Sequence, residues 1–165
     1  MHPRPEWLLA LRVMALWAVA PGMVEGAGTG LSGDYYNNAD FTAKVAARVD
    51  GPIDFDWGAG APIGGVGADT FSVRWFGQVE PEFSEEYTFH VTADDGVRLW
   101  VDDRVVAVRA YASPQQPTVR GRVTLEAGRR TNIRLEYIEN SGSAKVRLEW
   151  SSPSRAREVI PVARL

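Results

Sequence analysis

From Leu31 onward the chain consists of short segments in which apolar and polar residues alternate. Phe71, Val73 and Trp75, for example, occupy every second position of one segment. A period of two places successive side chains on opposite faces of a strand, and no helical period of 3.6 residues occurs after Leu31. The strands that we expect cover residues 31–36, 41–49, 53–57, 71–75, 87–91, 97–108 (as a hairpin), 119–125, 131–137 and 146–150.

Turn-forming residues separate these segments, at residues 37–40, 58–67, 127–128 and 140–143. Short strands at this spacing predict an all-β fold, an antiparallel β-sandwich or barrel. A length of 165 residues favours one domain with a short appendage. We therefore expect one β domain over residues 30–165, and we expect it to be a monomer.

Residues 1–29 differ in composition from the rest. Arg4 and Arg12 accompany an apolar run over residues 8–20, and small residues follow at 26–30. This order resembles a secretory signal peptide, with a linker as the alternative. The apolar run is shorter than the roughly 20 residues that span a bilayer. We expect a secreted or cell-surface protein whose mature domain does not insert into a membrane.

The composition argues against several kinds of function. A net charge of −3 and a pI near 5.4 argue against nucleic-acid binding, because nucleic-acid-binding domains usually carry a basic surface patch. The absence of cysteine excludes disulfides, a thiol nucleophile and a thiolate zinc site. With His2 and His90 as its two histidines, the chain cannot build a multi-histidine metal site.

Asp94, Asp95 and Gly96 lie between two alternating segments. Aspartate and glycine suit a tight turn, so a turn is one interpretation. Adjacent carboxylates also repel each other and can bind a hard cation through oxygen ligands, so a metal site is the other. We expect Asp102–Asp103 to form a hairpin turn. We expect His90 to be an ordinary residue on the face of a sheet.

Several sequence blocks carry a resemblance to a known family. They are LSGDYY at 31–36, IDFDWG at 53–58, FSVRWFG at 71–77, YTF at 87–89, DDGVRLWV at 94–101, RLEY at 134–137 and VRLEW at 146–150. In this order they resemble the protective-antigen amino-terminal (PA-fourteen) domain family, over about residues 30–165. That family occurs in toxins, glycosidases and yeast-type lectin adhesins. The resemblance implies a lectin-like antiparallel β-sandwich or barrel.

In the lectin-like members a pair of aspartates chelates Ca²⁺, and the ion binds sugar hydroxyls. The resemblance implies this role for Asp94 and Asp95, with a cis peptide between them. The second loop of those lectins corresponds to residues 139–143, where Asn140 is the expected side-chain ligand and Glu139 the alternative.

A sugar held at such a site needs further contacts beside the ion. We expect Gly96 and Ser141 to contact it next to the metal ligands, and Tyr111, in the loop of residues 110–118, to supply an aromatic wall. Trp57 and Trp100 fit the core better, because both belong to alternating segments.

The sequence thus predicts a non-catalytic, calcium-dependent carbohydrate-binding module whose partner is a glycan. The alternative is a structural or protein-interaction module without metal or sugar, in which the aspartates only shape a turn. A hydrolase would need a nucleophile–base pair or a tuned carboxylate dyad, and the sequence reveals neither.

Overall fold

The computed structural model describes residues 28–110 and 117–165. Strands make up most of this part of the chain, which confirms the all-β prediction. They are β1 (Leu31–Tyr36), β2 (Lys44–Asp50), β3 (Asp54–Gly58), β4 (Phe71–Val79), β5 (Glu85–Ala93), β6 (Gly96–Val101), β7 (Arg104–Arg109), β8 (Thr118–Leu125), β9 (Thr131–Glu139), β10 (Ala144–Ser152) and β11 (Arg155–Val159), followed by the 3-10 helix η1 (Val162–Arg164).

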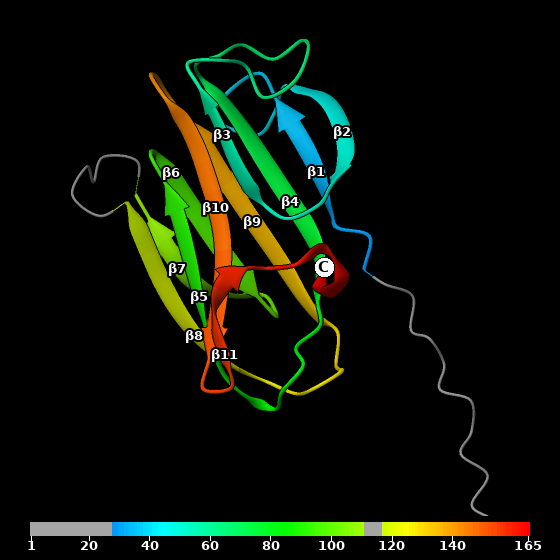
Figure 1. Ribbon diagram of the computed structural model, residues 1–165. Coiled ribbons are helices and arrows are strands. Elements are labelled where there is room, and N and C mark those ends of the chain that lie inside the picture. The colour runs from blue at the N-terminus through cyan, green and yellow to red at the C-terminus, as the bar shows by residue number, and fades with distance from the viewer. Residues whose placement is uncertain (1–27, 111–116) are drawn as a thin grey trace, which may run out of the picture.

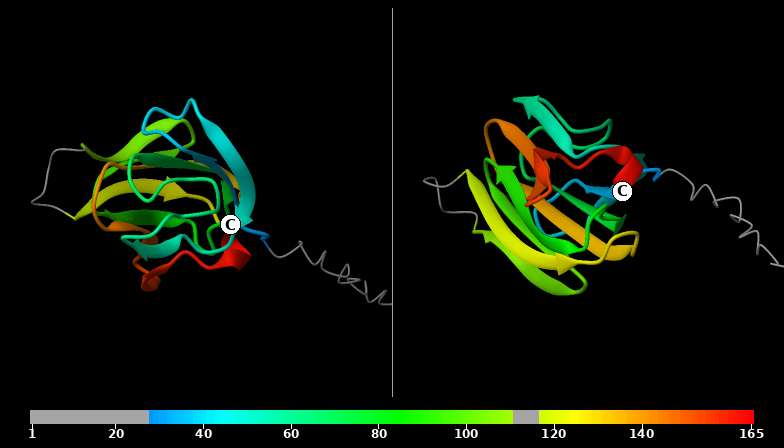
Figure 2. Two further views of the ribbon diagram at one scale, coloured as in Figure 1. Left: turned by 90° about the horizontal axis from the view of Figure 1, so that it is seen from above. Right: turned by 60° about the horizontal axis from the view of Figure 1, so that its bottom comes forward.

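The strands form two antiparallel sheets. The six-stranded sheet has the order β2-β1-β4-β9-β6-β7, and the five-stranded sheet has the order β11-β10-β5-β8, with β3 also paired to β10. Figures 1 and 2 show the sheets as two layers that face each other. The predicted antiparallel β-sandwich is confirmed.

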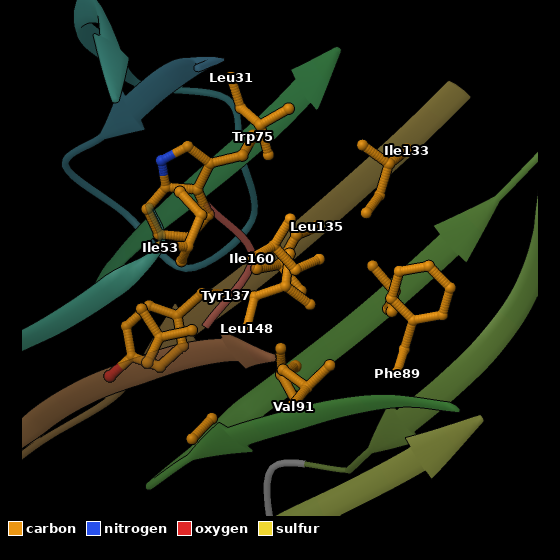
Figure 3. Close-up of a cluster of buried hydrophobic side chains, with 14 of the residues drawn as sticks. Leu31, Ile53, Trp75, Phe89, Val91, Ile133, Leu135, Tyr137, Leu148 and Ile160 are labelled. Atoms are coloured by element: carbon orange, nitrogen blue, oxygen red, sulfur yellow. The ribbon is translucent and has the colours of Figure 1, made fainter. Parts of the chain in front are cut away.

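The core lies between the two layers. Phe71, Val73 and Trp75 of β4 are completely buried, as their alternation predicts. Leu135 of the six-stranded sheet and Leu148 of the five-stranded sheet point toward each other in Figure 3. Both sheets therefore bury one face, and the polar residues between these positions face outward.

Two expected strands differ in their bounds, and one strand was not expected. The second strand begins at Lys44 rather than Phe41, because Phe41 has a φ of 61° and lies in the preceding turn. Strand β4 continues to Val79. Strand β11 was not expected, since its sequence, RAREV, does not show strict alternation.

The core interpretation of Trp100 is wrong. Trp100 pairs with Arg134 across β6 and β9, on the outer face of the six-stranded sheet. Its neighbours Leu99 and Val101 take the inward positions. Trp57 is partly buried and packs against the core, stacked on Phe55 with ring centroids 5.0 Å apart.

The predicted turn at Asp102–Asp103 is confirmed. Both residues have positive φ, 51° and 61°, and join β6 to β7 as a hairpin. Two-residue hairpins often need positive φ at both central positions, and aspartate tolerates this conformation better than most residues. This aspartate pair has a local structural role.

Two connections cross between the sheets at one end of the sandwich. Asp94 and Asp95 link β5 of the five-stranded sheet to β6 of the six-stranded sheet. Residues 140–143 link β9 to β10 in the opposite direction. Because Gly96 pairs with Ile138 and Ala93 with Val146, these two crossings lie side by side.

The first described residues lie beside the end of the chain, where the Gly30 N–H donates to the Leu165 carbonyl oxygen over 3.3 Å. Figure 2 shows the same proximity from two directions. The expected leader, residues 1–29, lies almost wholly outside the described residues. Within 28–110 and 117–165, no helix has the length and apolar character needed to cross a membrane.

Candidate functional site

Asp94 is anchored to β10. Its backbone N–H donates to the carbonyl oxygen of Lys145 over 3.3 Å, and the Lys145 N–H donates to Asp94 Oδ1 over 3.1 Å. Asp94 Oδ1 also accepts a hydrogen bond from the N–H of Asp95 at 3.1 Å. The carboxylate therefore stabilises the crossing, as the turn interpretation predicts.

Asp95 is bound to the second crossing. The backbone N–H of Asn140 donates to Asp95 Oδ2 over 2.8 Å. On its other side this loop contacts the segment before β4: the Thr70 N–H donates to the Asn140 carbonyl oxygen, and the Gly142 N–H donates to Asp69 Oδ1, both over 3.0 Å. The two loops that the sequence predicted to be neighbours are in direct contact.

Tyr137 connects two of the acidic residues. Its hydroxyl lies 2.6 Å from Glu139 Oε2 and 2.9 Å from Asp94 Oδ1, and it accepts a hydrogen bond from the Lys145 N–H over 3.2 Å. Tyr137 and Glu139 are both completely buried. Sequence reasoning included Tyr137 in the expected strand of residues 131–137 and missed this polar role. The sequence already indicated that Glu139 lies beside Tyr137, because residues two apart on a strand share a face.

The burial of Glu139 changes its acidity. Desolvation is the largest cause and raises the pKa of Glu139 to about 7; the hydrogen bond from Tyr137 opposes this rise, while the charges of Asp95 and Asp94 add to it. Burial and the hydrogen bond to Glu139 also raise the pKa of Tyr137. Glu139 therefore changes its protonation state near neutral pH.

A basic side chain, also missed by sequence reasoning, reaches the same place. Arg109, buried on β7, donates from Nη1 to the carbonyl oxygen of Asp95.

Two acidic oxygens of the site, Asp94 Oδ2 and Glu139 Oε1, are buried without a hydrogen-bond partner. An unsatisfied buried oxygen is costly, so these two atoms mark the place where a ligand would be favourable.

Not every expected feature of a calcium site is present. The peptide between Asp94 and Asp95 is trans, because the described residues contain no cis peptide, and the expected cis geometry is wrong. In the same residues no group of three or more His, Cys, Asp or Glu side chains is arranged to hold a metal ion. In the arrangement described, the aspartate oxygens mainly hold the two loops together.

A family comparison identifies the fold. The family model described as the PA14 domain matches residues 28–163. The chain belongs to the PA14 domain family. The protective-antigen resemblance of the sequence blocks is therefore confirmed.

Two curated relatives align with most of this PA14 domain. Anti-sigma-I factor RsgI3 of Acetivibrio thermocellus is 46% identical over 140 residues, which cover 85% of this chain and 22% of that protein. Protective antigen of Bacillus anthracis is 28% identical over 141 residues, covering 82% and 18%. The chain thus spans about one fifth of the length of these curated relatives.

Solved structures give the same fold. An anti-sigma factor domain-containing protein superposes with a TM-score of 0.80 at 45% identity, covering 85% of this chain and 48% of that chain. A PA14 sugar-binding domain from an RTX adhesin gives 0.67 at 20% identity, covering 82% and 97%. The Epithelial Adhesin 6 A domain from Candida glabrata, in complex with Galb1-3GlcNAc, gives 0.66 at 18% identity, covering 84% and 86%.

The remaining residues that we expected to contact a sugar differ in their exposure to solvent. Gly96 is buried as the first residue of β6, and Ser141 is exposed at the tip of the second loop. The side-chain amide nitrogen of Asn140 lies 3.5 Å from Ser141 Oγ. Tyr111 lies outside the described residues.

His90 and Ser151 form a pair that the sequence did not reveal. His90 Nε2 lies 2.9 Å from Ser151 Oγ on the outer face of the five-stranded sheet, and burial lowers the pKa of His90. A serine–histidine nucleophile needs a carboxylate on the other ring nitrogen. His90 Nδ1 is buried without a hydrogen-bond partner, so this pair lacks the third member of a triad.

Proposed function

We propose that this PA14 domain is a non-catalytic, calcium-dependent carbohydrate-binding module of a secreted or cell-surface protein. One observation carries the proposal. Asp94, Asp95 and Glu139 lie where the two sheet crossings meet, with the Tyr137 hydroxyl between the carboxyl groups of Asp94 and Glu139, and two of the buried oxygens have no hydrogen-bond partner. The glycan would be held through the ion.

The charge balance of the site supports a cation. The guanidinium of Arg109 contributes one positive charge beside three carboxyl groups. Desolvated like charges raise the free energy of the site, and the raised pKa of Glu139 reflects this. A divalent cation would stabilise all three groups in their ionised form.

The available oxygens suit calcium. Ca²⁺ accepts about 6–8 oxygen ligands in flexible geometry, including carboxylates, amide and backbone carbonyls and water. Asp94 Oδ2 and Glu139 Oε1, which lack a hydrogen-bond partner, would gain the ion as a partner. The Asn140 side chain would need to leave Ser141 to become a ligand. We propose that vicinal sugar hydroxyls take ligand positions otherwise filled by water, with Ser141 beside them.

Two solved structures with the same fold support carbohydrate binding by analogy. The RTX adhesin domain is described as sugar-binding, and the Epithelial Adhesin 6 domain was solved with a disaccharide. Both share the fold of this chain at 20% identity or less. We propose that the glycan binds at the end of the sandwich where the two sheet crossings lie.

A specific set of observations favours a second candidate, a structural or protein-interaction module. Asp94 and Asp95 already accept backbone hydrogen bonds from Lys145 and Asn140, and the peptide between the aspartates is trans. The relative that shares 46% identity is an anti-sigma-I factor rather than an adhesin. In this candidate the aspartates fix the loops and bind no metal.

Calcium titration by calorimetry decides between the two candidates. The first candidate expects a dissociation constant of about 1 mM or tighter, the range of extracellular calcium modules. Asp95→Asn should abolish this heat, whereas Asp103→Asn, in the other aspartate pair, should leave it unchanged. No heat for the native chain, with no rise in melting temperature on adding calcium, would reject the first candidate.

A glycan array tests the sugar part separately. We expect spots that bind the native chain in calcium to lose their signal with chelator and with Asp95→Asn. Binding that persists with chelator would reject the calcium-mediated mechanism. Calcium binding without any glycan signal would confine the ion to a structural role.

A further inference from the structure

The outer face of the six-stranded sheet carries a continuous row of cross-strand neighbours. Strand register places one residue from each strand in this row, and consecutive members are directly paired. Directly paired residues point to the same side of a sheet. The row reads Val49, Ser32, Phe76, Arg134, Trp100 and Val105 from β2 to β7.

This face carries most of the large hydrophobic residues that are exposed in the described part of the chain. Val49 is 63% exposed, Phe76 42% and Val105 52%, and Val108 in the next row is 47% exposed. These are four of the six large hydrophobic residues classed as exposed in the described part of the chain. Contiguous exposed apolar surface marks an interaction site more often than scattered single residues do.

The outer face of the five-stranded sheet is different. There Arg147 forms a two-bond ion pair with Asp54, at 2.6 and 2.9 Å, and Lys145 lies 3.2 Å from Asp56. Charged pairs of this kind keep a sheet face solvated. The apolar surface is therefore a property of one sheet, not of the whole molecule.

Two arginine side chains lie against Trp100 on the apolar face. The guanidinium carbons of Arg134 and Arg98 lie 3.9 and 5.4 Å from its ring centroid. Among the described residues, neither arginine forms an ion pair. On the same face Lys44 is paired with Asp34 at 2.7 Å and Arg74 with Glu136 at 2.8 Å.

We propose that this face is a docking surface for a protein partner that presents carboxylates around an apolar centre. Arg98 and Arg134 would each bind a carboxylate through the guanidinium fork, as arginine does at interfaces. Phe76 and Val105 would be buried by the apolar centre. Tryptophan and arginine in a desolvated patch are the residues that usually dominate binding energy.

The dimensions and the stacking favour a protein over a glycan at this place. Six strands spaced at about 4.8 Å give a row roughly 24 Å long, comparable to the side of a standard interface of about 800 Å² per partner. A depression of about 390 Å³ lies along the row between Phe76 and Trp100. Arg134 already stacks on the Trp100 ring, so a sugar would have to displace it.

This surface is independent of the calcium proposal. It lies on the outside of one sheet, whereas Asp94 and Asp95 lie in the connection between the sheets. Substitutions on the face should therefore leave calcium binding unchanged, and the two proposals fail separately.

Selection of peptides tests the proposal with a defined probe. A random twelve-residue peptide library displayed on phage is selected on the full chain, and enriched peptides are synthesised for affinity measurement. We expect enriched sequences to combine aspartate or glutamate with large apolar residues. Their affinity should fall at least tenfold on Arg134→Glu and on Phe76→Ser, and remain unchanged on Arg122→Glu, an exposed arginine of the other sheet.

The charge-reversed chain provides the reciprocal test. Selection on Arg98→Glu/Arg134→Glu should enrich basic rather than acidic peptides, with an unchanged melting temperature as proof of folding. Enrichment of peptides without acidic residues, or equal binding to Arg134→Glu, would overturn the proposal. A glycan-array signal lost in Phe76→Ser would overturn it in favour of a sugar platform. Self-association in sedimentation that Phe76→Ser removes would overturn it in favour of a second copy.

Discussion

The backbone N–H of Asn140 donates to the carboxylate of Asp95 over 2.8 Å, and this hydrogen bond joins the two loops that cross between the sheets. Each loop belongs to a different strand pair, so the contact fixes one end of the sandwich. The aspartate therefore has a stabilising role without any ion. A cation at this site would bind a carboxylate that already accepts this hydrogen bond through Oδ2.

Asp95→Ala should destabilise the domain even in the presence of chelator. The variant leaves the Asn140 N–H without its acceptor, and a partly buried unsatisfied donor costs about 1–3 kcal/mol. Asp95→Asn retains an amide oxygen and should cost less than half as much. Urea unfolding with chelator measures both. Equal stability of Asp95→Ala and the native chain would show that the loops do not depend on this contact.

The sequence predicted the sandwich because alternation reports directly which residues face the core. It also predicted the contact between the two crossings, although only through the family resemblance. It failed for Trp100, which was assigned to the core because it belongs to an alternating segment. The alternation of Leu99 and Val101 already placed Trp100 on the opposite face, so the period was the better guide.

The polar centre of the candidate site could be predicted only in part. Glu139 continues the inward series of Ile133, Leu135 and Tyr137, which alternation alone could have revealed. The approach of Arg109 could not be predicted, because it depends on how β7 lies relative to the first crossing. The Asp94–Asp95 peptide geometry was transferred from the family and was wrong.

Glu139 should make stability decrease as pH rises. Its pKa is about 7 in the folded domain and near 4.5 when unfolded, so the folded state binds the extra proton between these values. The stabilisation is complete below about pH 4.5 and is lost as pH rises through 7. We expect a loss of up to roughly 3.5 kcal/mol over the whole range, since one pKa unit corresponds to about 1.4 kcal/mol.

Other groups also titrate in this range, so the comparison with Glu139→Gln isolates the effect. The difference in unfolding free energy between the native chain and this variant should fall from pH 5 to pH 8 in chelator. Glu86→Gln, an exposed position, serves as the control with a flat difference. A flat difference for Glu139→Gln would mean that Glu139 is ionised throughout.

Asp50→Ala should be among the most destabilising single changes in the domain. Asp50 is 5% exposed, and its Oδ2 accepts hydrogen bonds from the Tyr35 hydroxyl and Trp75 Nε1, both over 2.6 Å. Arg48 donates to the other carboxylate oxygen. Removing a buried charged partner typically costs about 3–5 kcal/mol.

Chemical denaturation of Asp50→Ala measures this cost. Asp54→Ala is the matched control, because it breaks an aspartate–arginine pair at the surface, which is worth about 1 kcal/mol or less. Similar small losses for both variants would show that the buried network contributes no more than a surface ion pair.

Gly121→Ala should destabilise the side of the sandwich where β7 and β8 approach each other. These strands are edges of different sheets, and a Cβ at Gly121 would lie 1.8 Å from the carbonyl oxygen of Val106. The backbones must separate to admit a methyl group, at a cost of about 1–3 kcal/mol for overpacking. Gly51→Ala is the control, since its Cβ would meet no atom within 4 Å. Thermal or urea unfolding should separate the two variants, and an unchanged Gly121→Ala domain would mean that β7 and β8 pack less closely than this.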